Sequence, residues 1–144
     1  MPAQAVAPVV PSLTRRLASM AYEGLLLIGV LATGFLVPHL VLGIGLKTVL
    51  PGWLLVCHVF ALLGGYFVWH WRRAGQTLAM RTWRLLLSTP SGMKPTLVRL
   101  VWRYALAWPG LGMLGASILW ALIDRDRQFL HDRLAGTRLV IKLE

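Results

Sequence analysis

The chain has 144 residues, which is enough for one domain, and 57% of them are hydrophobic while only 14% are charged. Together with a mean hydropathy of +0.66, this composition excludes an ordinary water-soluble globular protein. A net charge of +10 would favour nucleic-acid binding in a soluble chain, but here most basic residues flank apolar segments, where they determine topology. We therefore predict a membrane protein that contacts lipids and does not bind nucleic acid.

The chain begins with a segment, residues 1–14, that contains three prolines and no charge, and we expect a flexible tail. Residues 15–144 are predicted to form one transmembrane domain. Its first span is expected over about 17–42, because no charged residue occurs from Gly24 to Leu46 and about 20 apolar residues suffice to cross a bilayer. A cleaved signal peptide would have its basic residues first and a shorter apolar core, so we expect this span to stay in the protein.

The second span is predicted over about 52–71, because Thr48 to Trp71 is uncharged and Pro51 favours a helix that starts at the next residue. A basic, amphipathic segment, residues 75–87, follows and is expected to form an interfacial helix or a short strand. Four arginines in this region are candidate contacts for anionic lipid head groups: Arg72, Arg73, Arg81 and Arg84.

The third apolar segment, about 97–123, is interrupted by Pro109-Gly110, a pair that stops or kinks a helix. We predict two half-helices that form a re-entrant hairpin shielded by the other spans, and a complete third crossing is the alternative. Residues 124–144 are predicted to form a cytoplasmic tail, in which Thr137 to Lys142 is β-branched enough for a strand. If this strand pairs with Arg84 to Ser88, both segments lie on the same side of the membrane.

Basic residues determine the expected orientation. Two precede the first span, Lys47 alone separates the first two spans, seven lie from Arg72 to Arg103, and five follow Ile123. The positive-inside rule then places the N-terminus and the Arg72 to Arg103 loop in the cytoplasm and Lys47 outside. The five basic residues of the tail favour the hairpin, which keeps the tail in the cytoplasm, whereas a complete third crossing would place it outside. The expected fold class is an all-α integral membrane protein with two full transmembrane helices, a third Pro/Gly-broken helical hairpin and a small cytoplasmic β element.

Four short motifs are spread along this domain: Arg15-Arg16-Leu17-Ala18, Tyr22-Glu23, Gly75-Gln76-Thr77 and the block from His131 to Thr137. Together they resemble the RDD family of small bacterial membrane proteins, which is named after one arginine and two aspartates. The resemblance covers nearly the whole chain from Arg15 onward and implies that Arg16, Glu23 and Asp132 are the signature residues. This chain has Glu at the first acid position, and Leu78-Ala79-Met80 stands where Gly and Lys are usual.

For function, the resemblance implies transport of ions or small solutes in a bacterial inner membrane, with sodium–proton exchange proposed for some members. Because three helical units enclose little space, we expect a homo-oligomer or a partner membrane subunit. The alternative is a non-transporting scaffold or an accessory subunit that binds anionic lipids. The sequence contains no nucleophile elbow, phosphate loop or paired catalytic carboxylates and no motif for a metal or cofactor, so an enzyme is not expected.

Glu23 is an acid inside a predicted span, where a charge is costly and is a functional-site candidate by default. Arg16 is on the same helix face two turns away, but helical side chains lean toward the N-terminus, so we do not expect a direct pair. Arg99 or Arg103 at the hairpin entrance is the expected partner. Three interpretations of Glu23 stay open: a structural ion pair, a transport or proton-relay acid, and a carboxylate that snorkels.

Asp132 is the second candidate acid. A structural role is expected, in which it accepts hydrogen bonds from a helix N-terminus or from the loop of Gln76 and Thr77. Alternatively, Asp132 passes ions to Glu23, and His131 beside it would suit such a relay because histidine titrates near neutral pH.

Overall fold

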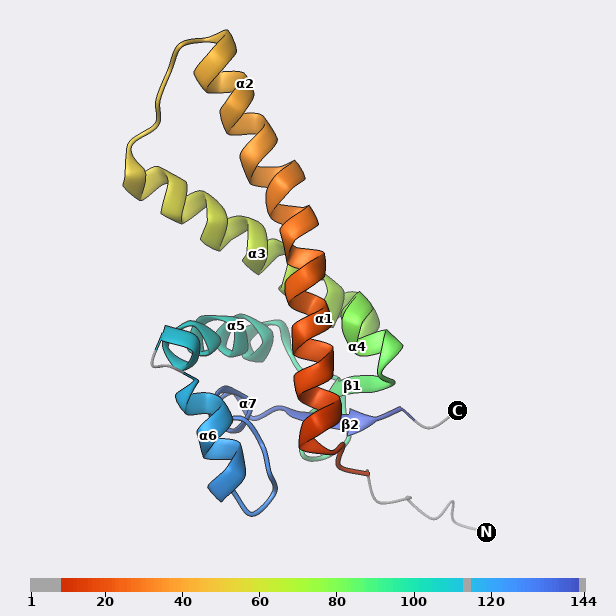
Figure 1. Cartoon of the computed structure of the whole chain (residues 1–144). Helices are drawn as coiled ribbons and strands as arrows, with labels where there is room; N and C mark the ends of the chain where they lie inside the picture. Colours follow the sequence, from red (N-terminus) through yellow and green to blue (C-terminus); the bar gives the residue numbers. More distant parts are fainter. Residues whose placement is uncertain (1–8, 113–114, 143–144) are drawn as a thin grey trace.

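The computed structural model describes residues 9–112 and 115–142. A long continuous helix dominates Figure 1 and consists of α1 (Leu13–Leu31), the π-helical turn η1 (Ala32–Leu36) and α2 (Val37–Gly45). Pro38 stands in the first turn of α2 and has no N–H to donate to the preceding turn. The π-helical turn before Pro38 accommodates this missing donor without ending the helix.

The helix α3 (Gly52–Ala74) returns toward the start of α1 (Figure 1). It begins after Pro51, as predicted, and ends at Gly75, which adopts the left-handed conformation with φ +70°. A Cβ atom at position 75 would lie 2.9 Å from Leu86 Cδ1, so this turn requires glycine for both its backbone and its space. The two helices, Leu13–Gly45 with 33 residues and Gly52–Ala74 with 23, are long and apolar enough to cross a membrane.

The remaining elements gather where α1 begins and α3 ends (Figure 1): α4 (Leu78–Thr82), β1 (Leu85–Ser88), α5 (Leu97–Gly112), α6 (Ala116–Ile123), α7 (Leu130–Leu134) and β2 (Arg138–Ile141). We call residues 9–31, 63–112 and 115–142, which contain these elements, the packed end. The buried apolar side chains of the described chain all lie here, with Leu85, Leu100 and Phe129 nearly inaccessible. The core of the protein is therefore at one end of the two long helices.

The two strands pair antiparallel, with Leu85 opposite Ile141 and Ser88 opposite Arg138. The strand expected near the end of the chain is therefore present, and its partner is the segment after the second span that was considered above. Backbone hydrogen bonds extend the sheet on both sides, since Leu87 N donates to Gly75 O (2.8 Å) and Ile141 N donates to Val9 O (3.0 Å).

The third apolar segment is broken into two helices, but the predicted position of the break is wrong. Pro109 lies inside α5, which continues to Gly112, and α6 starts after Gly115, whose φ is +78°. A proline removes one helical hydrogen bond, and α5 continues past Pro109, whereas the left-handed glycine stands at the start of α6. In Figure 1, α6 leaves the end of α5 at a steep angle. Insertion of this unit into a membrane as a hairpin stays a prediction.

The predicted flexible tail, residues 1–14, is corrected where the structure describes it. Its first eight residues lie outside the described chain. Of the others, Leu13 and Thr14 belong to α1, and Pro11 is fully buried. The segment before α1 is therefore packed against the sheet and the first helical turn.

Candidate functional site

The buried face of α1 is polar. Its buried residues are Arg16, Ser19 and Glu23, spaced three and four apart so that they share one side of the helix. Beyond the first turn, most residues on the other sides are apolar, and Leu25 and Ile28 are 66% and 64% exposed. This distribution is the reverse of an amphipathic helix in a water-soluble protein and fits a helix with lipid outside and polar groups inside.

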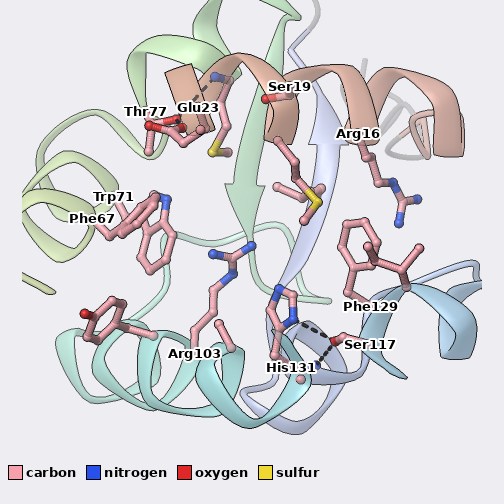
Figure 2. Close-up of a pocket in the computed structure, with 18 of the residues that line it drawn as sticks. Arg16, Ser19, Glu23, Phe67, Trp71, Thr77, Arg103, Ser117, Phe129 and His131 are labelled. Carbon is pink, nitrogen blue, oxygen red and sulfur yellow. Dashed lines mark hydrogen bonds between the residues drawn. The ribbon is translucent and has the colours of Figure 1, made fainter. Parts of the chain in front are cut away.

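The polar face of α1 forms one wall of a cavity of about 360 Å³ (Figure 2). The opposite walls come from α3, α4, α5, α6 and α7. Most of the lining is apolar, and polar groups are few, as is usual for sites that bind small molecules. The sequence-predicted residues Arg16, Glu23, Thr77, Arg103 and His131 all line this cavity.

Glu23 is 8% exposed and accepts two hydroxyl hydrogen bonds, one from Tyr66 (2.7 Å) and a shorter one from Thr77. Within residues 9–112 and 115–142 no cation lies within ion-pairing distance of this carboxylate. The expectation of an ion pair with Arg99 or Arg103 is therefore wrong, and so is that of a carboxylate that snorkels outward. The expectation that Arg16 does not pair with Glu23 is confirmed.

The loop of Gly75, Gln76 and Thr77 supplies one of the two donors to Glu23. Thr77 is also the N-cap of α4, since its hydroxyl accepts a hydrogen bond from Met80 N (3.3 Å). Gln76 is buried, and its Oε1 has no hydrogen-bond partner in the described part of the chain. This loop contacts the first signature acid, so the predicted bond from Gln76 or Thr77 to Asp132 is wrong.

Asp132 is 1% exposed and pairs with Arg103, whose Nε lies 2.5 Å from Asp132 Oδ1. The guanidinium of Arg103 also lies 4.3 Å from the centre of the Trp71 ring, a cation–π geometry. Thr137 N donates to the backbone carbonyl of Asp132 (2.9 Å). The carboxylate of Asp132, on α7, thus links this helix to α5, which carries Arg103.

Arg16 is 1% exposed and donates to backbone carbonyls. Its Nε and Nη2 lie 3.2 and 3.0 Å from Pro11 O, and Nη1 donates to Arg127 O. Its guanidinium also lies 5.7 Å from the centre of the Phe129 ring. Arg16 therefore joins the segment before α1 to the loop between α6 and α7.

His131 is held between Ser117 and Asp132. Its Nδ1 lies 2.9 Å from Ser117 Oγ, its Nε2 lies 3.8 Å from Asp132 Oδ1, and its ring stacks on Phe129. Burial lowers the pKa of His131 to about 4; Asp132 opposes this shift and Arg103 adds to it. The imidazole is therefore neutral at physiological pH, and the expectation of a histidine that titrates near neutrality is wrong.

The model of the RDD family matches residues 10–136. The chain belongs to the RDD family. No curated protein and no solved structure matches the chain. The family match confirms the resemblance carried by the four motifs.

In this RDD protein, the residues of the three signature positions belong to one packed cluster, in which Arg16 and Glu23 line the cavity and Asp132 holds Arg103 in its wall. Sequence reasoning missed the hydroxyls that complete the cluster, Tyr66 and Ser117. Their signal was weak, because an isolated Tyr or Ser in an apolar helix has many uses.

The other predicted residues lie outside the cavity. Arg99 is exposed and donates to Gly136 O (3.1 Å). The four candidate lipid-binding arginines are also exposed, and Arg73 lies 5.4 Å from the centre of the Trp69 ring.

Proposed function

We propose that this RDD protein is a multi-pass protein of the bacterial inner membrane that moves a small ion or solute through the cavity beside Glu23. The observation that carries the proposal is a buried carboxylate that borders a cavity and has no cationic partner in the described chain. A homo-oligomer or a partner membrane subunit would complete the pathway, because the helical units of one chain enclose little space.

The two partners of Glu23 suit an acid that changes its state. A hydroxyl both donates and accepts hydrogen bonds, so Tyr66 and Thr77 can stabilise the ionised carboxylate as donors and the protonated carboxyl as acceptors. An arginine or lysine in their place would fix the ionised form. Loading and release of a cation or proton at Glu23 therefore requires no rearrangement of a protein ion pair.

Flux into liposomes tests the proposal. Purified protein reconstituted into liposomes should move sodium ions, protons or a small solute, and Glu23→Gln should abolish this flux while the protein stays folded and inserted. Asp126→Asn is the matched control, since Asp126 is an exposed acid remote from the cavity, and it should keep full flux. Full flux in Glu23→Gln would remove this acid from the mechanism.

The orientation is tested by cysteine labelling in a Cys57→Ser background, because the native cysteine is exposed. We propose that the loop between α6 and α7 lies in the cytoplasm, and Arg125→Cys should then react with an impermeant thiol reagent only from the cytoplasmic side. Lys47→Cys should react only from the outside. Both positions are exposed, so a reversed pattern would refute this topology.

A second candidate function is a non-transporting subunit that binds anionic lipids. The exposed arginines Arg72, Arg73 and Arg81 at the end of α3 and on α4 favour it. Under this alternative the wild type gives no flux with any ion. Changing these three arginines to Gln should then reduce the binding of phosphatidylglycerol in native mass spectrometry.

A further inference from the structure

Arg103 presents unused hydrogen-bond donors to the cavity. Its Nε donates to Asp132, but its two terminal nitrogens have no hydrogen-bond partner among the described residues, and Figure 2 shows them pointing into the cavity. The residue is 7% exposed, so bulk water does not surround this group. An arginine fork fits a planar carboxylate with two parallel hydrogen bonds, so these cavity-facing donors suit such a group.

Trp71 packs against this group on the same side. Its Nε1 is buried and has no hydrogen-bond partner in the described chain, and its ring lies against the Arg103 guanidinium. This contact fixes the plane of the guanidinium and leaves its outer edge toward the cavity. The side of the cavity formed by α3 and α5 is therefore suited to an anionic group.

Glu23 faces this donor set from α1, across the cavity (Figure 2). An ionised carboxylate offers about four lone-pair sites, and Tyr66 and Thr77 occupy two of them. The unused sites suit an ammonium group, which is a compact cation with three donors.

The charges around the cavity also select the ligand. Arg103 is balanced by Asp132, His131 is neutral at physiological pH, and the donors of Arg16 are directed to backbone carbonyls. A ligand that carries both a carboxylate and an ammonium adds no net charge and engages both walls. The apolar side chains of Met20, Leu63 and Phe67, which also line the cavity, would pack against an apolar substituent of the ligand.

We propose that the cavity binds a small zwitterion with an apolar substituent, with its anionic group on the terminal nitrogens of Arg103 and its ammonium on Glu23. A free aliphatic amino acid has this chemistry, and so does the head group of phosphatidylethanolamine. The inference rests on the proposed function and names the substrate class of that site.

Binding to purified protein in detergent, followed by isothermal titration, tests the inference with three probes. L-leucine carries both charges, 4-methylpentanoate lacks the ammonium, and 3-methylbutylamine lacks the carboxylate. We expect leucine to bind at least about tenfold more tightly than either analogue, because each analogue leaves one buried polar group without a partner. Equal affinity of leucine and either analogue would overturn the inference.

Variants of both walls extend the test. Arg103→Gln alone leaves Asp132 buried without a partner and can fail to fold, so the double variant Arg103→Gln with Asp132→Asn is used as well. The double variant and Glu23→Gln should each lose leucine binding about tenfold or more. Arg99→Gln, on the same helix but exposed and outside the cavity, should keep it. Unchanged leucine binding in the double variant would refute the role of Arg103.

Two comparisons separate the remaining possibilities. In nanodiscs with phosphatidylethanolamine, competition with leucine assigns the site to the lipid head group, whereas unchanged leucine binding assigns it to a free solute. Leucine binding without any flux would refute the proposed transport and keep the inference. Sodium or proton flux from a protein that binds neither zwitterion would refute the inference and keep transport.

Discussion

The two ends of the molecule differ in what they bury. In residues 32–59, which we call the apolar arm, no residue is buried, and Val41, Ile44 and Val49 are 63%, 78% and 89% exposed. In the packed end, Arg16 and Asp132 are each 1% exposed. Buried charge and exposed aliphatic surface in one chain are what we expect if lipid surrounds the arm and the packed end encloses polar groups, as proposed above.

The largest expected effect comes from breaking the buried ion pair. Asp132→Ala leaves the Arg103 guanidinium buried without its counter-charge and should lower the free energy of unfolding by about 3–5 kcal/mol. In the arm, Val41→Ala should change it by no more than about 0.5 kcal/mol. Thermal unfolding in detergent measures both. Combining Asp132→Asn with Arg103→Gln should recover most of the loss, and equal stability of Asp132→Ala and Val41→Ala would contradict the comparison.

His131 should make the packed end sensitive to acid. Its pKa is about 4 in the folded protein and near 6.5 when unfolded, so only the unfolded state gains a proton between these values. Stability should be complete above about pH 6.5 and fall as the pH decreases toward 4, by on the order of 3 kcal/mol. Unfolding midpoints measured from pH 7.5 to 4 show this slope. The variant His131→Gln should lose most of it, and a slope that persists would assign the acid sensitivity to other groups.

Two adjacent glycines in α3 allow a matched test of packing. A Cβ atom at Gly64 would lie 2.9 Å from Tyr104 Cε1, and that ring is held by the hydrogen bond from its hydroxyl to Phe60 O (2.7 Å). Gly64→Ala should therefore destabilise the protein by about 1–3 kcal/mol. Gly65 has nothing within 4 Å of the corresponding position, so Gly65→Ala should be neutral or stabilising by up to about 1 kcal/mol. Equal effects would mean that α3 and α5 are not in contact here.

The smallest expected difference is between the effects of changing Asp124 and Asp126, the two acids after α6. The Asp124 side chain is 4% exposed and accepts hydrogen bonds from Arg133 and from Gln128 N, whereas Asp126 is 65% exposed and 3.9 Å from Arg133. Asp126→Asn should change stability by less than about 0.5 kcal/mol. Asp124→Asn should accelerate tryptic cleavage after Arg125 and Arg127. Faster tryptic cleavage of Asp126→Asn than of Asp124→Asn would contradict this prediction.

Much of the fold was predictable because it depends on local signals. Pro51 and the run of uncharged residues set the start of α3. The β-branched residues near the C-terminus identified a strand, which pairs with Leu85–Ser88. The error at Pro109 has a local cause too, since α5 tolerates a proline in its interior and continues to Gly112, while the left-handed Gly115 directly precedes α6. The signature residues Arg16, Glu23 and Asp132 were identified from the family motifs.

The partners of these residues were not predictable, because they are distant in sequence. Tyr66 lies 43 residues from Glu23, and Arg103 lies 29 residues from Asp132. Spacing along one helix predicts which side chains share a face, but it does not predict which neighbouring helix supplies a donor. Charge alone favoured an arginine for Glu23, whereas the packing of α3 and α4 against α1 placed two hydroxyls there.

Cysteine accessibility in native membranes tests most directly whether polar groups are enclosed and apolar surface faces lipid. Ser19 lines the cavity and is 4% exposed, while Ile28 lies on the outer side of the same helix and is 64% exposed. Each is changed to cysteine in a Cys57→Ser background. A small charged thiol reagent should label position 19 and leave position 28 unlabelled, because water reaches the cavity and lipid covers Ile28. Fast labelling of position 28 with none at position 19 would show a helix surrounded by water and would contradict the proposed site.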